Sequence, residues 1–312
     1  MKFQFIYRIW PFFIFMLLSV GILGAYLSQD NTVKSTVESN TVHLTQPKQE
    51  IAAVKKQSIN TSKPWLYTFN EKDSKQVDTT LFNVENGTQT SDYNNELQTY
   101  TDRTDNVRVE GNALVIEAKQ ESRDGKDYTS ARINTQGTFT FTYGVLQVEM
   151  KLPKGTGTWP AAWLMPDTPK YTPDQYGIGK DAPKAWALNG EIDFMEAVGY
   201  IPNQIIPATH SYNSLSQGTI YTPGFIDDAY GTYHKYGVIK LKDSISFTID
   251  GKVYATRTRS STNPLDWPYD QPYYLILNLA IGGSWAGQKG IDNSSAPWTM
   301  SVKSISYLPL SQ

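Results

Sequence analysis

The sequence predicts an all-β protein, a sandwich of antiparallel sheets. Short segments with alternating apolar and polar residues recur along most of the chain, and many are rich in β-branched and aromatic residues. Gly, Asn and Pro separate these segments, as turns between strands require. No long stretch has the 3.6-residue periodicity of an amphipathic helix, and no internal repeat is apparent. Many short strands joined by such turns are typical of a two-sheet sandwich.

Five segments carry the clearest strand pattern. They are ALVIEA (113–118), GVLQVEMKL (144–152), YHKYGVIKL (233–241), SISFTIDGKVYATRTR (244–259) and YYLILNLAIGG (273–283). The fourth segment contains Asp250 and Gly251, a residue pair that favours a two-residue hairpin turn. We therefore expect two paired strands within 244–259.

Composition excludes several classes of function. The chain has 312 residues, no cysteine and a formal net charge of -2. Disulfides, thiolate metal sites and cysteine nucleophiles are ruled out, and nothing points to nucleic acid as a partner. The three histidines, His43, His210 and His234, lack metal-ligand spacing. We expect no cofactor, and we regard His234 as structural.

The N-terminus carries an apolar run over residues 10–27, preceded by Lys2 and Arg8. The run is long for the core of a signal peptide and just long enough to cross a bilayer as a helix. The residues that follow it form a poor cleavage site. Residues 1–27 are therefore either a signal peptide or a signal anchor, and an anchor would leave the rest of the chain outside the cell.

Residues 28–63 are rich in Ser, Thr, Asn, Gln and Lys and contain no aromatic residue. Such a composition predicts a flexible polar linker. From residue 64 onward the composition changes, and seven of the 8 tryptophans lie in this part of the chain. We place one domain at 64–312.

The segment NGEIDFMEAVGY (189–200) holds three acidic residues in an apolar run. Glu191 and Asp193 are two apart and share one face of a strand, whereas Glu196 would point to the other face of a regular strand. One extra residue, a β-bulge, would return Glu196 to the face of the other two. The sequence therefore predicts a bulged strand with three carboxylates on one side and an apolar row on the other.

Three neighbouring carboxylates repel one another and raise one another's pKa. A site that needs one ionised and one protonated carboxyl benefits from this arrangement. A retaining glycosidase uses two carboxyls about 5–5.5 Å apart, one as nucleophile and one as acid/base. A calcium cluster and a solvated edge strand are the alternatives; calcium ligands usually come from loops, and Ile192, Phe194 and Met195 argue against an exposed edge.

The motif GEIDFMEAVG resembles the signature of family 16 glycoside hydrolases, in the bulged E-x-D-x-x-E form of laminarinases. Further segments resemble that family in the same order along the chain. They are NNELQTYT (94–101), TSARINTQGTFTFTYG (129–144), LPKGTGTWPAAWLMP (152–166), THSYN (209–213), TIDGKVY (248–254) and WPYDQPYYLILNLAIGGSWAG (267–287). The resemblance implies a jelly-roll β-sandwich with a concave substrate cleft.

The same resemblance implies a role for each site residue. Glu191 would be the nucleophile and Glu196 the acid/base, with Asp193 bonded to the nucleophile between them. Trp159, Trp163 and Trp285 match positions where the family lines its cleft with aromatic rings, although a strand phase that turns Trp163 into the core is an alternative. Further substrate contacts are implied for Asn95, Arg132 and His210, and Arg132 by itself could equally form a salt bridge.

The sequence departs from the family at a structural calcium site. Many relatives use an acidic residue in the first strand and an aspartate in the last, where this chain has Thr68 and Lys303. Losing two oxygen ligands and gaining an ammonium should abolish cation binding. We therefore expect no bound metal.

The resulting function is retaining, endo-acting hydrolysis of β-1,3-glucan by a monomer that is secreted or anchored to the outer face of the cell membrane. Two alternatives stay open. One is hydrolysis or transglycosylation of another β-glycan, such as mixed-linkage glucan or galactan, and the other is a non-catalytic glycan-binding sandwich. Paired carboxylates argue against the binder, which gains nothing from them.

Overall fold

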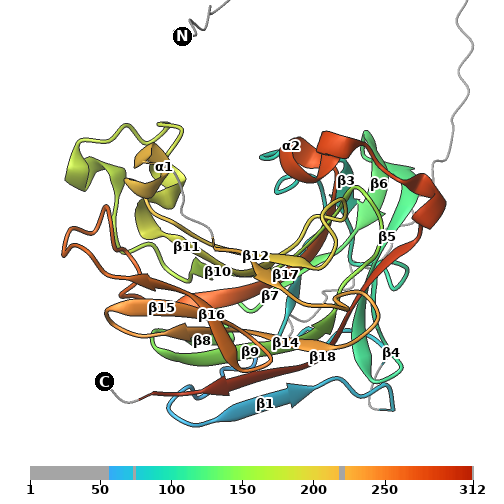
Figure 1. The fold of residues 1–312 in the computed structure, drawn as a ribbon, viewed down its shortest axis with the longest axis horizontal. Coiled ribbons are helices and arrows are strands. Elements are labelled where there is room, and N and C mark those ends of the chain that lie inside the picture. The colour runs from blue at the N-terminus through green and yellow to red at the C-terminus, as the bar shows by residue number, and fades with distance from the viewer. Residues whose placement is uncertain (1–55, 73–74, 218–221, 311–312) are drawn as a thin grey trace, which may run out of the picture. The chain divides into compact units, whose positions relative to one another are not determined.

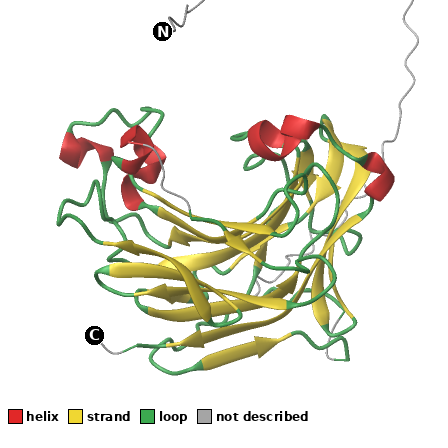
Figure 2. Ribbon diagram, in the orientation of Figure 1, coloured by secondary structure: helices red, strands yellow, loops and turns green. Residues whose placement is uncertain are grey.

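The computed structural model describes residues 56–72, 75–217 and 222–310, which form a compact all-β unit (Figures 1 and 2). The predicted signal peptide or anchor at 1–27 and most of the predicted linker lie outside the described residues. Within the described part of the chain, no helix is long and apolar enough to cross a bilayer.

Two sheets pack face to face in this unit. One has ten strands. In spatial order they are β16 (Lys252–Thr258), β15 (Ser244–Ile249), β14 (His234–Lys240), β9 (Gly144–Lys151), β18 (Trp298–Leu308), β5 (Ala113–Arg123), β6 (Lys126–Ser130) and β3 (Gln98–Tyr100), with β1 (Trp65–Thr68) beside β18 and β4 (Val107–Glu110) beside β5.

The second sheet has eight strands and carries the acidic motif. In spatial order they are β13 (Gly224–Phe225), β12 (Gln204–His210), β11 (Glu191–Glu196), β10 (Thr158–Pro166), β17 (Tyr273–Ile281), β7 (Arg132–Asn134) and β2 (Asn83–Val84), with β8 (Thr140–Phe141) beside β17. The segments that carry the short helices α1 (Ser214–Gln217) and α2 (Gly283–Ala286) rise on either side of this sheet in Figure 1.

Helices are short throughout the described residues. Besides α1 and α2 there are single 3-10 turns at η1 (Pro173–Tyr176), η2 (Ala185–Asn189), η3 (Gly287–Lys289) and η4 (Asn293–Ser295). The all-β sandwich of two sheets is thus confirmed. One strand pair departs from the expected antiparallel arrangement, because β3 pairs with β6 in parallel.

The segments with the clearest strand pattern all form strands. Residues 113–118 open β5, 144–151 form β9, 234–240 form β14 and 273–281 form β17. Residues 244–259 form the hairpin of β15 and β16. Asp250 and Gly251 sit at its turn with φ angles of 50° and 77°, the positive values that such a turn requires.

The core lies between the two sheets. Ile192 and Phe194 of β11 are fully buried in it, as are Leu146 and Val148 of β9 in the facing sheet. The alternation along β9, with every second residue buried, follows directly from the period of two in its sequence. Burial of this apolar side fixes the opposite side of β11 toward solvent.

The described end of the predicted linker contacts the domain that we placed at 64–312. The backbone N–H groups of Gln57 and Ile59 donate to the carbonyls of Thr80 and Thr138, and the Ile59 side chain packs against the core. The Lys56 ammonium also donates to the carbonyls of Thr79 and Phe82. Composition gave no sign of these contacts, because several of them use backbone groups, which every sequence has. The domain boundary itself stays a prediction.

Candidate active site

Strand β11 contains the predicted bulge. Against β10, Ala162 pairs with Met195 and the next residue, Trp163, pairs with Asp193, so that Phe194 is the extra residue on β11. The pairing with β12 shifts at the same place, between Asp193 and Glu196. The bulge returns Glu196 to the face of Asp193, while Phe194 and Met195 are both fully buried.

The pairings place the candidate residues on one face of the eight-stranded sheet. Glu196 lies opposite Ala161, Ala161 lies opposite Asn278, and Asn278 lies opposite Arg132. Asp193 of β11 and Trp163 of β10 also lie directly opposite each other. Directly opposed residues share a face, so the carboxylates, both tryptophans of β10 and Arg132 line the same surface.

The backbone just before β11 is held in place by a contact with β17. Tyr273 of β17 donates a hydrogen bond of 2.5 Å to the carbonyl of Asn189. Gly190 follows with a φ of 79°, and a Cβ at this position would lie 2.6 Å from the same tyrosine oxygen. Only glycine combines this conformation with so close an approach. Gly190 therefore fixes the position of the backbone at Glu191, the first residue of β11.

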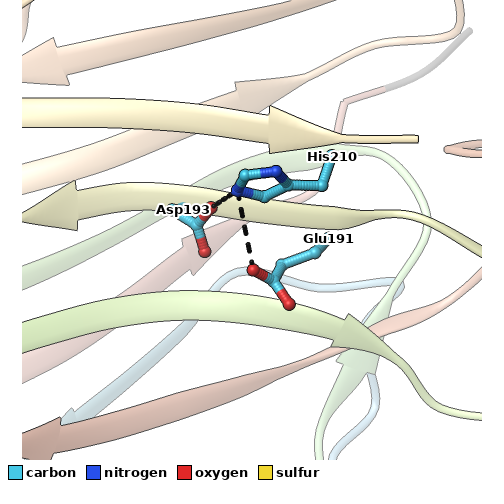
Figure 3. A group of neighbouring side chains, drawn as sticks. All are labelled: Glu191, Asp193 and His210. Atoms are coloured by element: carbon cyan, nitrogen blue, oxygen red, sulfur yellow. Dashed lines mark ion pairs between the residues drawn. The ribbon is translucent and has the colours of Figure 1, made fainter. Parts of the chain in front are cut away.

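His210 joins two of the carboxylates (Figure 3). Its Nε2 atom lies 3.0 Å from Asp193 Oδ2 and 3.7 Å from Glu191 Oε1. The backbone of His210 pairs with that of Glu191 across β11 and β12, which explains the contact. We expected Asp193 to bond to the nucleophile; instead, no hydrogen bond joins Asp193 and Glu191, both of which the structure describes, and His210 lies between them.

Glu196 has a different partner. The indole N–H of Trp159 donates to Glu196 Oε1 over 2.9 Å. The Trp159 ring meets that of Trp285 edge to face, with the ring centres 5.2 Å apart. Both tryptophans are half-buried, which leaves ring surface open for a sugar face. The acid/base candidate thus sits beside the aromatic part of the site.

Burial dominates the electrostatics of the three carboxyls. Burial and the charge of Asp193 raise the pKa of Glu196 to about 8, while the bond from Trp159 and the imidazole of His210 act in the opposite direction. Burial likewise raises the pKa of Glu191, reinforced by Asp193 and opposed by His210. The pKa of Asp193 is raised by burial. Glu196 therefore holds a proton at neutral pH, as an acid catalyst requires.

Trp163 and Arg132 form the next part of the surface. Trp163 is half-buried and faces the carboxylates, so the alternative of a core position is wrong. Its indole N–H donates to Asn278 Oδ1 over 2.7 Å. The Arg132 guanidinium lies 4.7 Å from the Trp163 ring centre, and its Nε lies 2.8 Å from Glu85 Oε1. Arg132 thus forms the salt bridge that we considered, on the face where a substrate contact was expected.

Asn95 lies at the edge of the site. Its side-chain amide donates to Ser284 Oγ over 3.0 Å, and Ser284 precedes Trp285 in α2. The neighbouring carbonyl of Asn94 accepts a bond from the backbone of Ser284. Segments nearly two hundred positions apart in sequence are thereby joined, and Asn95 is exposed beside Trp285.

Two residues at the site were missed from the sequence. Trp186 is 47% exposed, and its ring centre lies 5.7 Å from that of His210. A lone tryptophan in a Pro- and Lys-containing segment gave no signal. The second is Glu96, which is buried next to Asn95. The only clue in the sequence was that Glu96, Gln98 and Tyr100 are two residues apart, a spacing that places three polar side chains on one face of a strand.

The described residues contain one group suited to a metal, the donor atoms of Glu191, Asp193 and His210, which lie within 4.8 Å of one another. These atoms already pair among themselves, and we assign them to acid–base chemistry. At the calcium position of the family the residues do not fit a cation: Thr68 is exposed, and the Lys303 ammonium lies 4.2 Å from the Tyr233 ring centre and 3.9 Å from Glu149. The absence of bound metal stays a prediction.

Comparisons with known proteins find relatives that are named as enzymes acting on β-glucans. The chain is 38% identical over 216 residues to a protein of Rhodothermus marinus named beta-glucanase, covering 65% of this chain and 71% of that one. It is 33% identical to the glucan endo-1,3-beta-glucosidase of Cryptopygus antarcticus, over 69% of this chain and 80% of the relative. The X-ray structure of the laminarinase from Rhodothermus marinus superimposes with a TM-score of 0.69 at 32% identity, covering 79% of this chain and 97% of the other.

The profile of the family described as "Glycosyl hydrolases family 16" matches residues 80–300, which span all the strands of the eight-stranded sheet. This range is most of the 312-residue chain, and it includes every candidate site residue. The chain therefore belongs to glycosyl hydrolases family 16.

Proposed function

We propose that this protein is a retaining endo-β-1,3-glucanase that acts by double displacement. The observation that carries the proposal is the bulge at Phe194, which sets Glu191, Asp193 and Glu196 on one face together with Trp159 and Trp163. A regular strand would point Glu196 into the core. Two carboxyls beside sugar-stacking rings are what retaining glycoside hydrolysis requires.

In the first step the Glu191 carboxylate attacks the anomeric carbon, and the Glu196 carboxyl gives its proton to the departing glycosidic oxygen. A covalent glycosyl-enzyme ester and a shortened glucan result. In the second step Glu196, now a carboxylate, takes a proton from water, and the water oxygen displaces Glu191 from the anomeric carbon. The configuration at that carbon is retained.

His210 and Asp193 support the nucleophile in this scheme. The imidazole opposes the rise in the pKa of Glu191 and thus favours the ionised form that attacks. Its contact with Asp193 at 3.0 Å gives the imidazole a fixed position beside the attacking oxygen. The half-buried rings of Trp159, Trp163 and Trp285 would stack on glucose units along the chain.

Glu191→Gln tests the proposal, because an amide of the same shape cannot attack the anomeric carbon. We expect laminarin hydrolysis to fall by ~10⁴-fold or more, the order seen when a hydrolase loses its nucleophile, with an unchanged melting curve or a higher melting temperature. Near wild-type turnover would reject the nucleophile. Product analysis with laminarin, lichenan and agarose as substrates shows whether the enzyme cleaves β-1,3-glucan or another β-glycan. If the wild type bound laminarin without cleaving it, the alternative of a glycan-binding module would be favoured.

We further propose that the enzyme acts outside the cell as a monomer. The apolar run at 10–27 and the polar stretch that follows it support export, either with the run retained as a membrane anchor or with the run removed. The exposed large hydrophobic residues of the described domain, such as Leu66, Tyr93 and Phe225, lie on separate elements, which supports a monomer. Fractionation of expressing cells decides the first point, and light scattering of the purified protein decides the second.

A further inference from the structure

A fourth carboxylate, Glu96, lies buried beside Trp159, the tryptophan that donates to the acid/base. The residue is 7% exposed, and its backbone forms a bridge with Gly282 at the end of β17. A Cβ on the next residue, Gly283, would lie 3.3 Å from Glu96 Cγ and 3.4 Å from Trp159 Cζ3. Gly283 has a φ of 74° and leaves room for both side chains. The Glu96 side chain thus lies next to the ring whose N–H binds Glu196.

The Glu96 carboxylate is held by neutral donors. Gln98 Nε2 donates to Oε2 over 2.6 Å, Tyr100 donates its hydroxyl to the same oxygen over 3.3 Å, and Asn94 Nδ2 donates to Oε1 over 3.3 Å. Among the residues that the structure describes, no basic side chain forms an ion pair with this carboxylate. Lys126 instead bonds to the Glu96 backbone carbonyl and pairs with Asp92. Burial raises the pKa of this carboxyl, while the hydrogen bonds and the charge of Arg132 act in the opposite direction and favour the carboxylate.

The network continues to the far side of the site. The Tyr100 hydroxyl accepts a bond of 3.2 Å from Asn278 Nδ2, and Asn278 accepts the indole N–H of Trp163. Glu96 is therefore fixed in position relative to both tryptophans of β10. A fixed charge without an ion-pair partner, in a dry site, acts over a longer distance than an exposed one.

We propose that Glu96 is a positioning residue whose charge holds the proton on Glu196 until transfer and makes Glu196 a stronger base in the second step. This inference rests on the proposed function. The charged and titratable groups that face Glu196 are Glu191 and Asp193 of β11, His210 of β12 and Glu96 itself. Those that face Glu96 are Tyr100, Arg132 and Glu196. The negative charge of Glu96 contributes to the raised pKa of Glu196.

The test compares wild type with Glu96→Gln over the pH range of activity on laminarin. Removing the charge should let Glu196 lose its proton at lower pH, so the alkaline limb of the kcat/KM profile should move toward acid. The ratio of variant to wild-type kcat/KM should therefore fall by about threefold or more from about pH 6 to about pH 9. Glu96→Asp keeps the charge and should leave the limb close to the wild-type position.

A control variant and melting curves distinguish an effect of charge from a loss of packing or of sugar binding. Glu149→Gln removes a carboxylate from β9 in the opposite sheet and should leave the alkaline limb in place. Melting curves show whether each variant is folded. If Glu96 served only packing, Glu96→Asp would impair activity at every pH as much as Glu96→Gln; if Glu96 bound a sugar hydroxyl, Glu96→Gln would raise KM with no shift of the limb. Either result overturns the inference, whereas an inactive wild type would overturn the proposed function instead.

Discussion

At the scale of residues, much of the site follows from the face of strand β11 on which each side chain lies. The spacing of Glu191, Asp193 and Glu196 requires a bulge if all three share a face, and the bulge is confirmed. Glu96 and Trp186 could not be predicted as site residues, because their proximity to Glu196 and His210 depends on strand order and on the path of two long loops. Local spacing carries no information about either.

The acid/base role of Glu196 gives a first prediction. Glu196→Ala should lose most activity on laminarin, and added azide should restore cleavage of an aryl β-glucan whose leaving group needs no proton. A small anion enters the vacated space and attacks the glycosyl-enzyme without a general base. Chromatography and NMR should identify a glycosyl azide of retained configuration, and its absence would rule out this role.

Trp159 gives a prediction of the opposite sign to that for Glu96. Its hydrogen bond lowers the pKa of Glu196 by favouring the carboxylate. Trp159→Phe keeps an aromatic ring but removes the N–H, so Glu196 should keep its proton to higher pH and the alkaline limb of kcat/KM should move toward base. Losing a hydrogen bond to a charged group, of about 1.5–3 kcal/mol, together with stacking area, should lower kcat/KM by roughly tenfold to a hundredfold. A limb that stays in place would show that the bond at 2.9 Å has no influence on Glu196 during turnover.

At the scale of elements, strands with alternating sequence were predictable and their partners were not. The hairpin of β15 and β16 is local, and its Asp-Gly turn identifies it. The parallel pairing of β3 with β6 is not local: residues 98–100 and 126–130 are brought together by β5, which lies between them in sequence. A three-residue strand such as β3 has too few side chains to specify a partner or a direction.

Strands β1 and β18 carry the prediction about calcium. Thr68 and Ser304 are direct partners in this pair, and Lys303 lies next to the register shift of β18 against β9. With an exposed hydroxyl and an ammonium in place of two acids, the site offers a divalent cation little affinity. Thermal melts of the protein with excess calcium and with chelator should coincide, since only a bound ligand raises the melting temperature. A saturable rise with calcium would mean that other oxygen atoms replace the missing pair.

At the scale of the whole molecule, the fold class followed from composition and from the alternation of apolar and polar residues, while the contacts of residues 56–63 with the domain did not. Residues 56–63 look like linker but are bonded to residues 80 and 138. A fragment of residues 64–312 loses two backbone hydrogen bonds and the packing of Ile59. After the entropy cost of ordering this segment, we expect about 1–2 kcal/mol of lost stability.

This gives the prediction at the scale of the domain. Each 1 kcal/mol corresponds to about 2–4 °C in a domain of this size, so residues 64–312 should melt several degrees below residues 56–312. Differential scanning calorimetry measures the difference. The variant Ile59→Ser in the longer fragment should show part of this decrease in melting temperature. Equal melting temperatures of the two fragments would mean that residues 56–63 are a linker and do not stabilise the domain.

The position of β18 has a consequence for the order of events during synthesis. This strand ends at Leu308, close to the C-terminus, yet it lies between β9 and β5 in the middle of the ten-stranded sheet. Until the ribosome has released these residues, β9 and β5 have no partner to join them, and the sheet stays in two halves. The ten-stranded sheet can therefore close only after Trp298–Leu308 has been synthesised, and a stop codon before Trp298 should leave its two halves unjoined.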